Sequence, residues 1–154
     1  MKEQQKAIEK ADRDINLLAP FFYARVKAAI DECAAKDMPL WIVEAYRDAS
    51  RQNWLYASGR TREGQIVTKS RAWQSMHQYG LAVDLCGGTN RKPIWVMPWD
   101  KIRRIFELNG LQSLAPFEQA HFEINGGFTT KQLYEMAHSD GIEAVWAMVE
   151  KATL

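Results

Sequence analysis

Two histidines and one aspartate lie in short segments that could bring them to a single metal ion. His77 and Asp84 are seven positions apart in the segment SMHQYGLAVDL, and His121 lies in the segment AHFEI. Two neutral imidazoles and a carboxylate suit a catalytic zinc site, in which a fourth position stays open for water. A hydrogen-bonded histidine–aspartate pair without metal is the alternative that these residue types leave open.

Side-chain alternation along a strand predicts that Asp84 faces a cleft. Successive side chains of a strand point to opposite faces, so Val83 and Leu85 would enter the core and Asp84 would not. Gly80 permits the tight backbone path that would bring the His77 imidazole back toward this carboxylate. The chain therefore offers both groups at the start of one rigid element.

The segment AHFEI shows the same alternation. It places His121 and Glu123 on one face of a short strand and Phe122 on the other. A second imidazole is therefore available from a different strand.

The elements that must position these residues follow from the hydrophobic pattern. From residue 10 to residue 36, apolar side chains recur every three or four positions, which predicts helices that Pro20 separates. Residues 40–46, LWIVEAY, are typical of a buried strand. Asp48 can cap a following helix, for which Gly59 is a suitable C-terminal residue.

The rest of the chain combines one long loop with further strands and helices. Residues 59–74 lack a clear periodicity and are expected to form a long ordered loop, a kind of segment that is usually functional. We expect strands at residues 81–88, 92–96 and 120–124. We expect helices at residues 98–110, from a Thr129–Gln132 capping box to Gly141, and at residues 142–151.

The order of these elements predicts the fold class. Strands and helices do not alternate regularly, which indicates an α+β protein with a small, mainly antiparallel sheet and helices packed around it. No internal repeat, low-complexity tract or linker interrupts the sequence. We therefore expect a single domain over residues 1–154, with an extra C-terminal helical segment from about residue 129.

Composition and charge argue against several classes of function. Twenty basic and nineteen acidic residues give a net charge of +1, so no electrostatic footprint for nucleic acid is visible. The N-terminus is polar where a signal peptide would be apolar, and no apolar run could span a bilayer. Cys33 and Cys86 form no CxxC pair, so we expect two buried thiols.

Three segments together resemble a known family of zinc peptidases. SMHQYGLAVDL matches SxHxxGxAxD, the first zinc motif of the D-alanyl-D-alanine carboxypeptidase and L-alanyl-D-glutamate peptidase family, at every defined position. EQAHFE resembles the second motif, in which an acidic residue precedes the last zinc histidine by three positions. EAYRDASRQNWLYASGRTREGQIVT is similar to a segment of the phage endolysin branch that supplies a substrate-binding arginine. The three segments cover roughly residues 41–124 in the family's order, which implies its hedgehog-like fold with a zinc site at one face.

The resemblance implies a role for each matching residue. His77, Asp84 and His121 would bind Zn²⁺, and Glu118 would be the catalytic base. A carboxylate beside zinc-bound water can take its proton and later deliver it to the leaving amine. Glu123 shares a face with His121 and is the rival base, or else a partner that orients the imidazole.

Three further residues near these motifs are candidates for binding or positioning the substrate. Arg47 would hold the substrate carbonyl or a nearby carboxylate through its planar fork of donors and would help to stabilise the oxyanion. A surface ion pair with Asp48 or Glu44 is the alternative for this side chain. Ser75 and Tyr79 flank the zinc motif and would position the loop or contact the substrate.

Two other residues could be proposed as ligands but are not favoured. His138 lies in the last turn of a predicted helix, where a partial positive charge suits the helix dipole. Cys86 would share the face of Asp84 if the strand continues, which makes a thiolate near the metal conceivable.

The resemblance implies a zinc endopeptidase that cleaves the L-alanyl-D-glutamyl bond of peptidoglycan stem peptides, as similar phage endolysins do. A D,D-carboxypeptidase or D,D-dipeptidase is the alternative within the family, because Glu118 stands where the endopeptidase branch commonly has aspartate. A non-catalytic peptidoglycan-binding module is the alternative from another class. We expect a monomer without stable membrane association, made in the cytoplasm, that acts in the periplasm or cell wall after release by a holin.

Overall fold

A five-stranded sheet forms the centre of the computed structural model, which describes residues 8–154. Four strands follow the order β1-β2-β5-β4, β3 pairs with β2, and every pairing is antiparallel. The strands are β1 (Leu40–Glu44), β2 (Ala82–Gly88), β3 (Pro93–Ile94), β4 (Gln112–Leu114) and β5 (Glu118–Glu123). Because β2 lies between β1 and β5, its side chains can meet residues of both neighbours.

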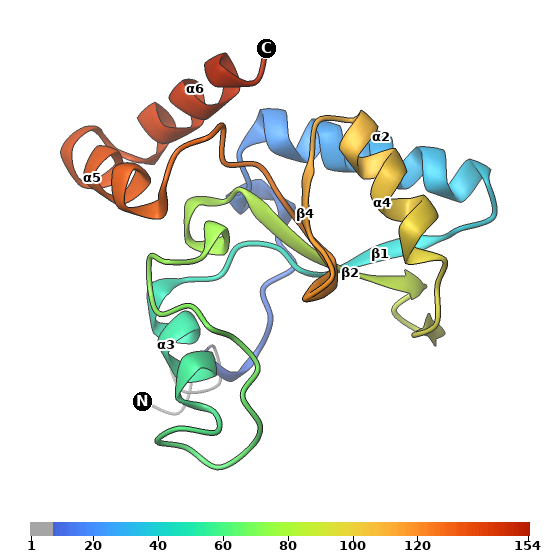
Figure 1. The fold of residues 1–154 in the computed structure, drawn as a ribbon, viewed down its shortest axis with the longest axis horizontal. Coiled ribbons are helices and arrows are strands. Elements are labelled where there is room, and N and C mark those ends of the chain that lie inside the picture. Colours follow the sequence, from blue (N-terminus) through green and yellow to red (C-terminus); the bar gives the residue numbers. More distant parts are fainter. Residues whose placement is uncertain (1–7) are drawn as a thin grey trace.

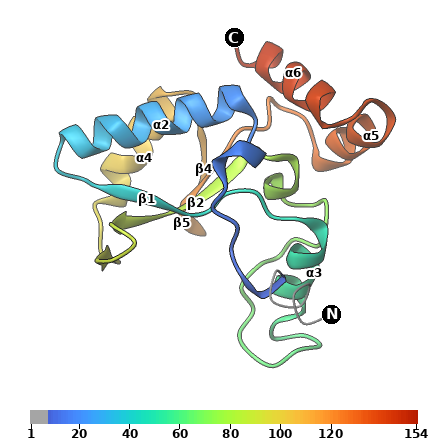
Figure 2. The same cartoon turned by 180° about the vertical axis from the view of Figure 1, so that it is seen from behind.

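Helices lie on both sides of this sheet (Figure 1). Two of them, α2 and α4, run along one face of the sheet. Helix α3 lies on the side of the opposite face, near one end of the sheet. The pair formed by α5 and α6 lies at the end where β2 begins, as the reverse view also shows (Figure 2). The helices are η1 (Ile15–Leu17), α2 (Pro20–Ala35), α3 (Ala49–Ala57), η2 (Met76–Tyr79), α4 (Trp99–Leu108), α5 (Thr130–Asp140) and α6 (Ile142–Ala152).

The two faces of the sheet differ in polarity, as strand alternation predicts. Val83 and Leu85 of β2 and Phe122 of β5 are buried on the side of α4. Phe106 of α4 stacks on Phe122, with ring centroids 4.2 Å apart. The opposite face carries Asp84, which is partly exposed. The observed α+β class, the antiparallel sheet and the predicted core face are therefore confirmed.

The predicted helix before Pro20 is wrong. Between residues 10 and 19 the structure has only the short 3-10 helix η1, and α2 begins at Pro20. The carboxylate of Asp12 accepts from the Asp14 amide, and the carboxylate of Asp14 accepts from the Asn16 amide. Such local bonds compete with helical hydrogen bonds. The amide of Ala45 also donates to the Asp12 carbonyl, which ties this stretch to the residues after β1.

Several element ends differ from the prediction. The first strand ends at Glu44 instead of residue 46, and α3 ends at Ala57 with Ser58 as its C-cap. Only Pro93–Ile94 of the predicted strand 92–96 pairs with β2. The strand predicted at 120–124 begins two residues earlier, at Glu118. Strand β4 is not predicted from the sequence, because a three-residue polar edge strand has too little apolar pattern to be recognised.

The last two helices pack onto the same core as the sheet. Their buried side chains are Leu133 of α5 and Val145 and Val149 of α6. Trp146 donates from Nε1 to the carbonyl of Tyr79 over 2.7 Å, so α6 also contacts the segment before β2. The capping box predicted at the start of α5 is confirmed. Within residues 8–154, no helix combines the length and the apolar character that crossing a bilayer requires.

Candidate metal centre and active-site cleft

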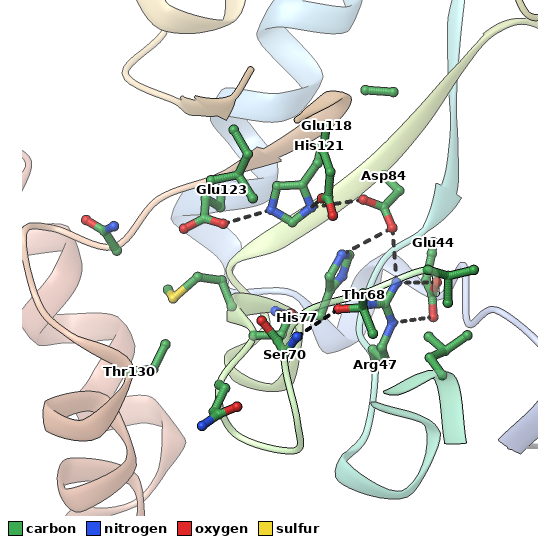
Figure 3. Close-up of a pocket in the computed structure, with 18 of the residues that line it drawn as sticks. Glu44, Arg47, Thr68, Ser70, His77, Asp84, Glu118, His121, Glu123 and Thr130 are labelled. Carbon is green, nitrogen blue, oxygen red and sulfur yellow. Dashed lines mark hydrogen bonds and ion pairs between the residues drawn. The ribbon is translucent and has the colours of Figure 1, made fainter. Parts of the chain in front are cut away.

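A cleft opens on the face of the sheet opposite α4 and has a volume of about 730 Å³. Strands β2 and β5 form its floor, α3 and the following loop form one wall, and the start of α5 closes one end (Figure 3). Residues 59–74 contain no helix and no strand of the sheet, as expected, and four of them line this cleft. The four are Val67, Thr68, Ser70 and Gln74.

His77, Asp84 and His121 converge at the floor of the cleft (Figure 3). One candidate ligand atom from each of the three lies within 4.8 Å of the other two. The Nε2 atom of His77 is 3.2 Å from Asp84 Oδ2, and the Nδ1 atom of His121 is 3.0 Å from Asp84 Oδ1. Asp84 and His121 meet because they are opposite each other in the β2–β5 ladder.

The short helix η2 delivers His77 to this cluster. Ser75 caps η2 by accepting from the His77 amide, and Gln78 completes the capping box. Gly80 ends the helix in the left-handed conformation, with φ of +68°. A side chain here would place its Cβ 2.7 Å from the Leu17 carbonyl oxygen, so the position requires glycine for both its angle and its space.

Hydrogen bonds hold the outer nitrogen of each imidazole. His77 Nδ1 lies 2.7 Å from the carbonyl oxygen of Ala45, which can only accept, so Nδ1 carries the proton. His121 Nε2 lies 2.8 Å from Glu123 Oε1. The Nε2 atom of His77 and the Nδ1 atom of His121 are therefore the nitrogens that face Asp84.

The cluster fits a bound cation. The Nε2 atom of His77 is buried and has no hydrogen-bond partner, although a carboxylate oxygen of Asp84 lies at ion-pair distance. With its proton on Nδ1, this imidazole turns a lone pair toward an anion. Two acceptors at such a distance repel each other unless a positive ion lies between them, and imidazole and carboxylate are both zinc ligands.

The pKa values of the cluster show the same preference for positive charge. Burial lowers the pKa of His121, but its hydrogen bonds to Asp84 and Glu123 prevail and raise it to about 9. Burial raises the pKa of Asp84, whereas the proximity of the His77 ring and the hydrogen bond to His121 prevail and bring it well below its ordinary range. A cation, as a proton or as a metal, is therefore favoured at this point.

Two glutamates lie on different sides of His121. Glu118, at the start of β5, lines the cleft with its Oε2 3.5 Å from Nδ1 of His121, and its side chain is 47% exposed. Glu123 contacts the other ring nitrogen and is nearly buried. Glu118 is therefore on the side of the imidazole that faces Asp84, and Glu123 is behind the ring.

Arg47 lies beside Asp84 with most of its donors engaged (Figure 3). It donates to Glu44 from Nε and Nη2, to Gln52 from Nη1 and to Asp84 Oδ2 from Nη2 over 3.1 Å. These four bonds leave one of the five guanidinium hydrogens for another partner. Arg47 therefore forms the alternative ion pair with Glu44. Its guanidinium has no free pair of N–H donors with which to bind a substrate. The ion pair is buried, and the expectation of a surface ion pair is therefore wrong in this respect.

A buried network surrounds this arginine. Arg51 also pairs with Glu44, and Gln78 donates to the carbonyl of Arg47 and to Gln52. Burial raises the pKa of Glu44, but the hydrogen bonds and charges of the two arginines prevail and lower it. Gln52 and Gln78 are not predicted from the sequence, and Glu44 is predicted only as a possible ion-pair partner. The detectable signal was a glutamate in the otherwise apolar segment LWIVE.

Ser75 and Tyr79 differ in their access to the cleft. Ser75 lines it and caps η2. Tyr79 is fully buried, and its hydroxyl donates to the carbonyls of Trp73 or Thr130. A substrate contact by Tyr79 is therefore not supported, because no part of the side chain reaches the cleft. The alternative role, positioning of the loop, fits its contacts.

The remaining candidates lie apart from the cluster. His138 is exposed on α5, and its ring lies against Trp73 and Tyr134. Cys86 is buried, and its Sγ faces the carbonyl of Ile94. Both cysteines are free and buried, as expected. Neither His138 nor Cys86 belongs to the metal-binding group found among residues 8–154.

Comparison with known proteins agrees with this geometry. The family model VanY, described as D-alanyl-D-alanine carboxypeptidase, matches residues 16–125, which include the cluster and Glu118. The peptidoglycan L-alanyl-D-glutamate endopeptidase CwlK of Bacillus subtilis (strain 168) is 36% identical over 84 residues. That match covers 54% of this chain and 50% of CwlK, so it spans about half of each protein. Because the family model covers more than half of the chain, the protein belongs to the VanY D-alanyl-D-alanine carboxypeptidase family.

Proposed function

We propose that the protein is a zinc-dependent peptidase that hydrolyses the L-alanyl-D-glutamyl bond of peptidoglycan stem peptides. The observation that carries this proposal is the convergence of His77, Asp84 and His121, with an unpartnered buried nitrogen turned toward the carboxylate. Similarity to CwlK, whose name describes this bond, supports the choice of substrate.

Each residue of the cluster would bind zinc through one atom. His77 would use Nε2, His121 would use Nδ1 and Asp84 would use a carboxylate oxygen, because these atoms face one another. A bound zinc ion would polarise the scissile carbonyl and lower the pKa of a water molecule to about 7. Glu123 would hold the His121 ring from behind through Nε2.

Glu118 is the base in this proposal. Its carboxylate stands at the cleft, on the side of His121 that faces Asp84, where it can accept a proton from the attacking water. The same carboxylate can then give that proton to the departing amine. Glu123 is less suited to this task, because its carboxylate lies behind the imidazole and already accepts from Nε2.

Arg47 would act mainly through Asp84. Its Nη2 atom donates to Asp84 Oδ2, which orients the carboxylate, and its charge lies close to the cleft. One N–H is left for a substrate oxygen. We propose this single contact in place of the bidentate hold expected from the sequence. Ser75 would contact the substrate from the rim of the cleft.

Digestion of purified peptidoglycan tests the proposal. Mass spectrometry of the products should reveal peptides with a free D-glutamyl N-terminus, and a chelator should prevent their release. Glu118→Gln should lower kcat by about 10²- to 10⁴-fold, the usual contribution of general acid–base catalysis, while metal analysis still finds one zinc per chain. A variant with nearly full activity would contradict the role of Glu118.

The same digest separates the other candidate activities. Loss of terminal D-alanine alone would favour a D,D-carboxypeptidase, which is the activity in the family's description. Release of a D-alanyl dipeptide would favour a D,D-dipeptidase. Clearing of a peptidoglycan suspension distinguishes a hydrolase from a non-catalytic binding module, which would bind without clearing. A single-domain, monomeric organisation and action in the periplasm after release by a holin stay predictions.

A further inference from the structure

The loop of residues 59–74, the cleft loop, carries positive charge that the fold leaves unpaired. It contains four cationic side chains and one acidic side chain, Glu63. The four cations are Arg60, Arg62, Lys69 and Arg71. None of them forms an ion pair with a residue in the range 8–154, whereas cations on the helices, such as Lys27 and Arg103, pair with acidic neighbours.

The three arginines of the cleft loop pack on α3. The guanidinium carbons of Arg60 and Arg71 lie 3.8 and 5.0 Å from the ring centroid of Tyr56. The guanidinium carbon of Arg62 lies 3.7 Å from the ring of Trp54, and both rings belong to α3. Arg60 and Arg62 also donate to backbone carbonyls of this helix. These contacts hold the loop against α3.

Lys69 reaches in the other direction, toward β5. Its Nζ atom lies 4.9 Å from the ring centroid of Phe117, which is 82% exposed in the turn between β4 and β5. The chain neighbours of this pair line the cleft, namely Thr68 and Ser70 beside Lys69 and Glu118 beside Phe117. An ammonium group therefore stands at the rim of the cleft, next to the end of β5 that carries the proposed base.

The interior of the cleft has the opposite charge. Asp84, Glu118 and Glu123 line it. Arg47 also lines it, but most of its donors are bound to protein groups. An anionic substrate group close to Glu118 would be repelled unless a cation accompanies it. Lys69 is a cation without an ion-pair partner that lies on this side of the cleft.

We propose that Lys69 binds the α-carboxylate of the D-glutamyl residue, on the leaving side of the scissile bond. The inference rests on the proposed function and adds a specificity-determining residue to it. In a stem peptide, the D-glutamyl residue continues the chain through its side-chain carboxyl group, so its α-carboxyl group is free. The carbon that bears this carboxylate also bears the leaving amine.

The proposed role of Glu118 fixes the place of this carboxylate. Glu118 must reach the leaving amine to protonate it, and three bonds of about 4 Å in total join that nitrogen to a carboxylate oxygen. The substrate carboxylate must therefore lie near Glu118, where Lys69 can offset the repulsion. A lysine ammonium has three donors on a flexible stem, and its contact with an exposed ring is weak, so a carboxylate can displace the ring of Phe117.

Two stem peptides that differ in one group test this contact. One has D-glutamate in the second position, and the other has D-isoglutamine, whose α-carboxamide is neutral. Lys69→Met should lower kcat/KM about tenfold for the glutamate peptide and by less than about twofold for the isoglutamine peptide, because only the first offers a carboxylate. Lys69→Arg should keep most of the preference for glutamate. Lys101→Met, exposed on α4 across the sheet, is the matched control and should change neither value.

Two kinetic outcomes would overturn the contact. One is an equal loss for both peptides in Lys69→Met, which would assign this lysine to the environment of Glu118 or to the shape of the loop. The other is an unchanged kcat/KM for the glutamate peptide.

Peptide binding to an inactive variant separates this proposal from the proposed function. Zinc-loaded Glu118→Gln protein is titrated with both peptides, with and without Lys69→Met. Tighter binding of the glutamate peptide, lost in Lys69→Met, supports the contact, and equal Kd values of the two peptides in the protein that retains Lys69 overturn it. If the parent protein cleaves neither peptide at the L-alanyl-D-glutamyl bond, the proposed function fails, and the titration still decides the contact.

Discussion

At the scale of single residues, the two imidazoles present different nitrogens to the cluster. His77 turns Nε2 inward because Nδ1 faces a backbone carbonyl, and His121 turns Nδ1 inward because Nε2 faces Glu123. The motif identifies both histidines but says nothing of their ring orientation. The orientation of His77 depends on a carbonyl 32 positions away in sequence, and that of His121 depends on Glu123 of the same strand.

Glu123 provides the residue-scale prediction. Its carboxylate holds the His121 ring and favours the tautomer with the proton on Nε2, which leaves Nδ1 for a metal. Glu123→Ala should weaken zinc binding by about 10- to 100-fold, measured by competition with a chromophoric chelator. Glu123→Gln keeps an acceptor oxygen without the charge and should lose less.

Glu107→Ala, on the exposed side of α4, is the matched control for removal of an acidic side chain. Zinc affinity equal to that of the parent in Glu123→Ala would contradict the positioning role. Activity alone would not decide the matter, since a general disturbance of the cleft would also lower it.

At the scale of elements, the turn between η2 and β2 decides whether the cluster forms. The capping box of Ser75 and Gln78 begins η2, and Gly80 ends it in the left-handed region. The chain then enters β2, which brings Asp84 next to His121. These signals are local, which explains why the segment around Gly80 could be interpreted from the sequence.

Replacement of this glycine gives the element-scale prediction. Gly80→Ala would meet both an unfavourable φ and the Leu17 carbonyl oxygen at 2.7 Å, whereas Gly127→Ala has a similar φ of +85° and open space. We expect Gly127→Ala to lower the free energy of unfolding by about 1–2 kcal/mol, the cost of the left-handed backbone. Gly80→Ala should lose clearly more and bind less zinc, measured by urea unfolding and metal analysis. Equal losses would show that the contact with Leu17 carries no cost.

At the scale of the whole molecule, a buried ion network connects segments that are distant in sequence. Glu44 at the end of β1 pairs with Arg47 and with Arg51 of α3, and Arg47 reaches Asp84 on β2. Gln52 of α3 extends the network to the carbonyl of Ser70 in the cleft loop. The metal cluster and the wall of the cleft are therefore joined to one buried carboxylate.

The network predicts how stability depends on pH. The folded-state pKa of Glu44 is lower than its ordinary value of 4.5, so the ionised carboxylate stabilises the fold above that pH. This contribution is lost as the pH falls through the folded-state pKa. Glu44→Gln should lower the free energy of unfolding at pH 7 by about 3–5 kcal/mol, since it leaves buried charges unpaired.

Urea unfolding between pH 7 and pH 3 measures both effects. The difference between Glu44→Gln and its parent should shrink as the pH falls below 4.5, because the parent's carboxylate then becomes neutral as well. Glu135→Gln, exposed on α5, is the control. A constant difference over the whole range would contradict the role of the ionised carboxylate.

The sequence by itself determined the fold class and the residues of the candidate metal centre. Strand alternation around Asp84 and His121 depends only on neighbouring residues, so it could be derived without the fold. The glycine between His77 and Asp84 and the capping box at Thr129 are also local signals, and the structure confirms them. The family resemblance added the expectation that these segments meet, which strand order alone did not provide.

Only the tertiary structure decided how the donors and acceptors are shared. It assigned most of the Arg47 donors to Glu44, Gln52 and Asp84, placed Glu123 behind the imidazole of His121, and buried Tyr79. Burial and hydrogen-bond partners depend on contacts between segments far apart in the chain. A motif records which side chains are present, whereas the packing of the fold determines which of their atoms remain available for a metal or a substrate.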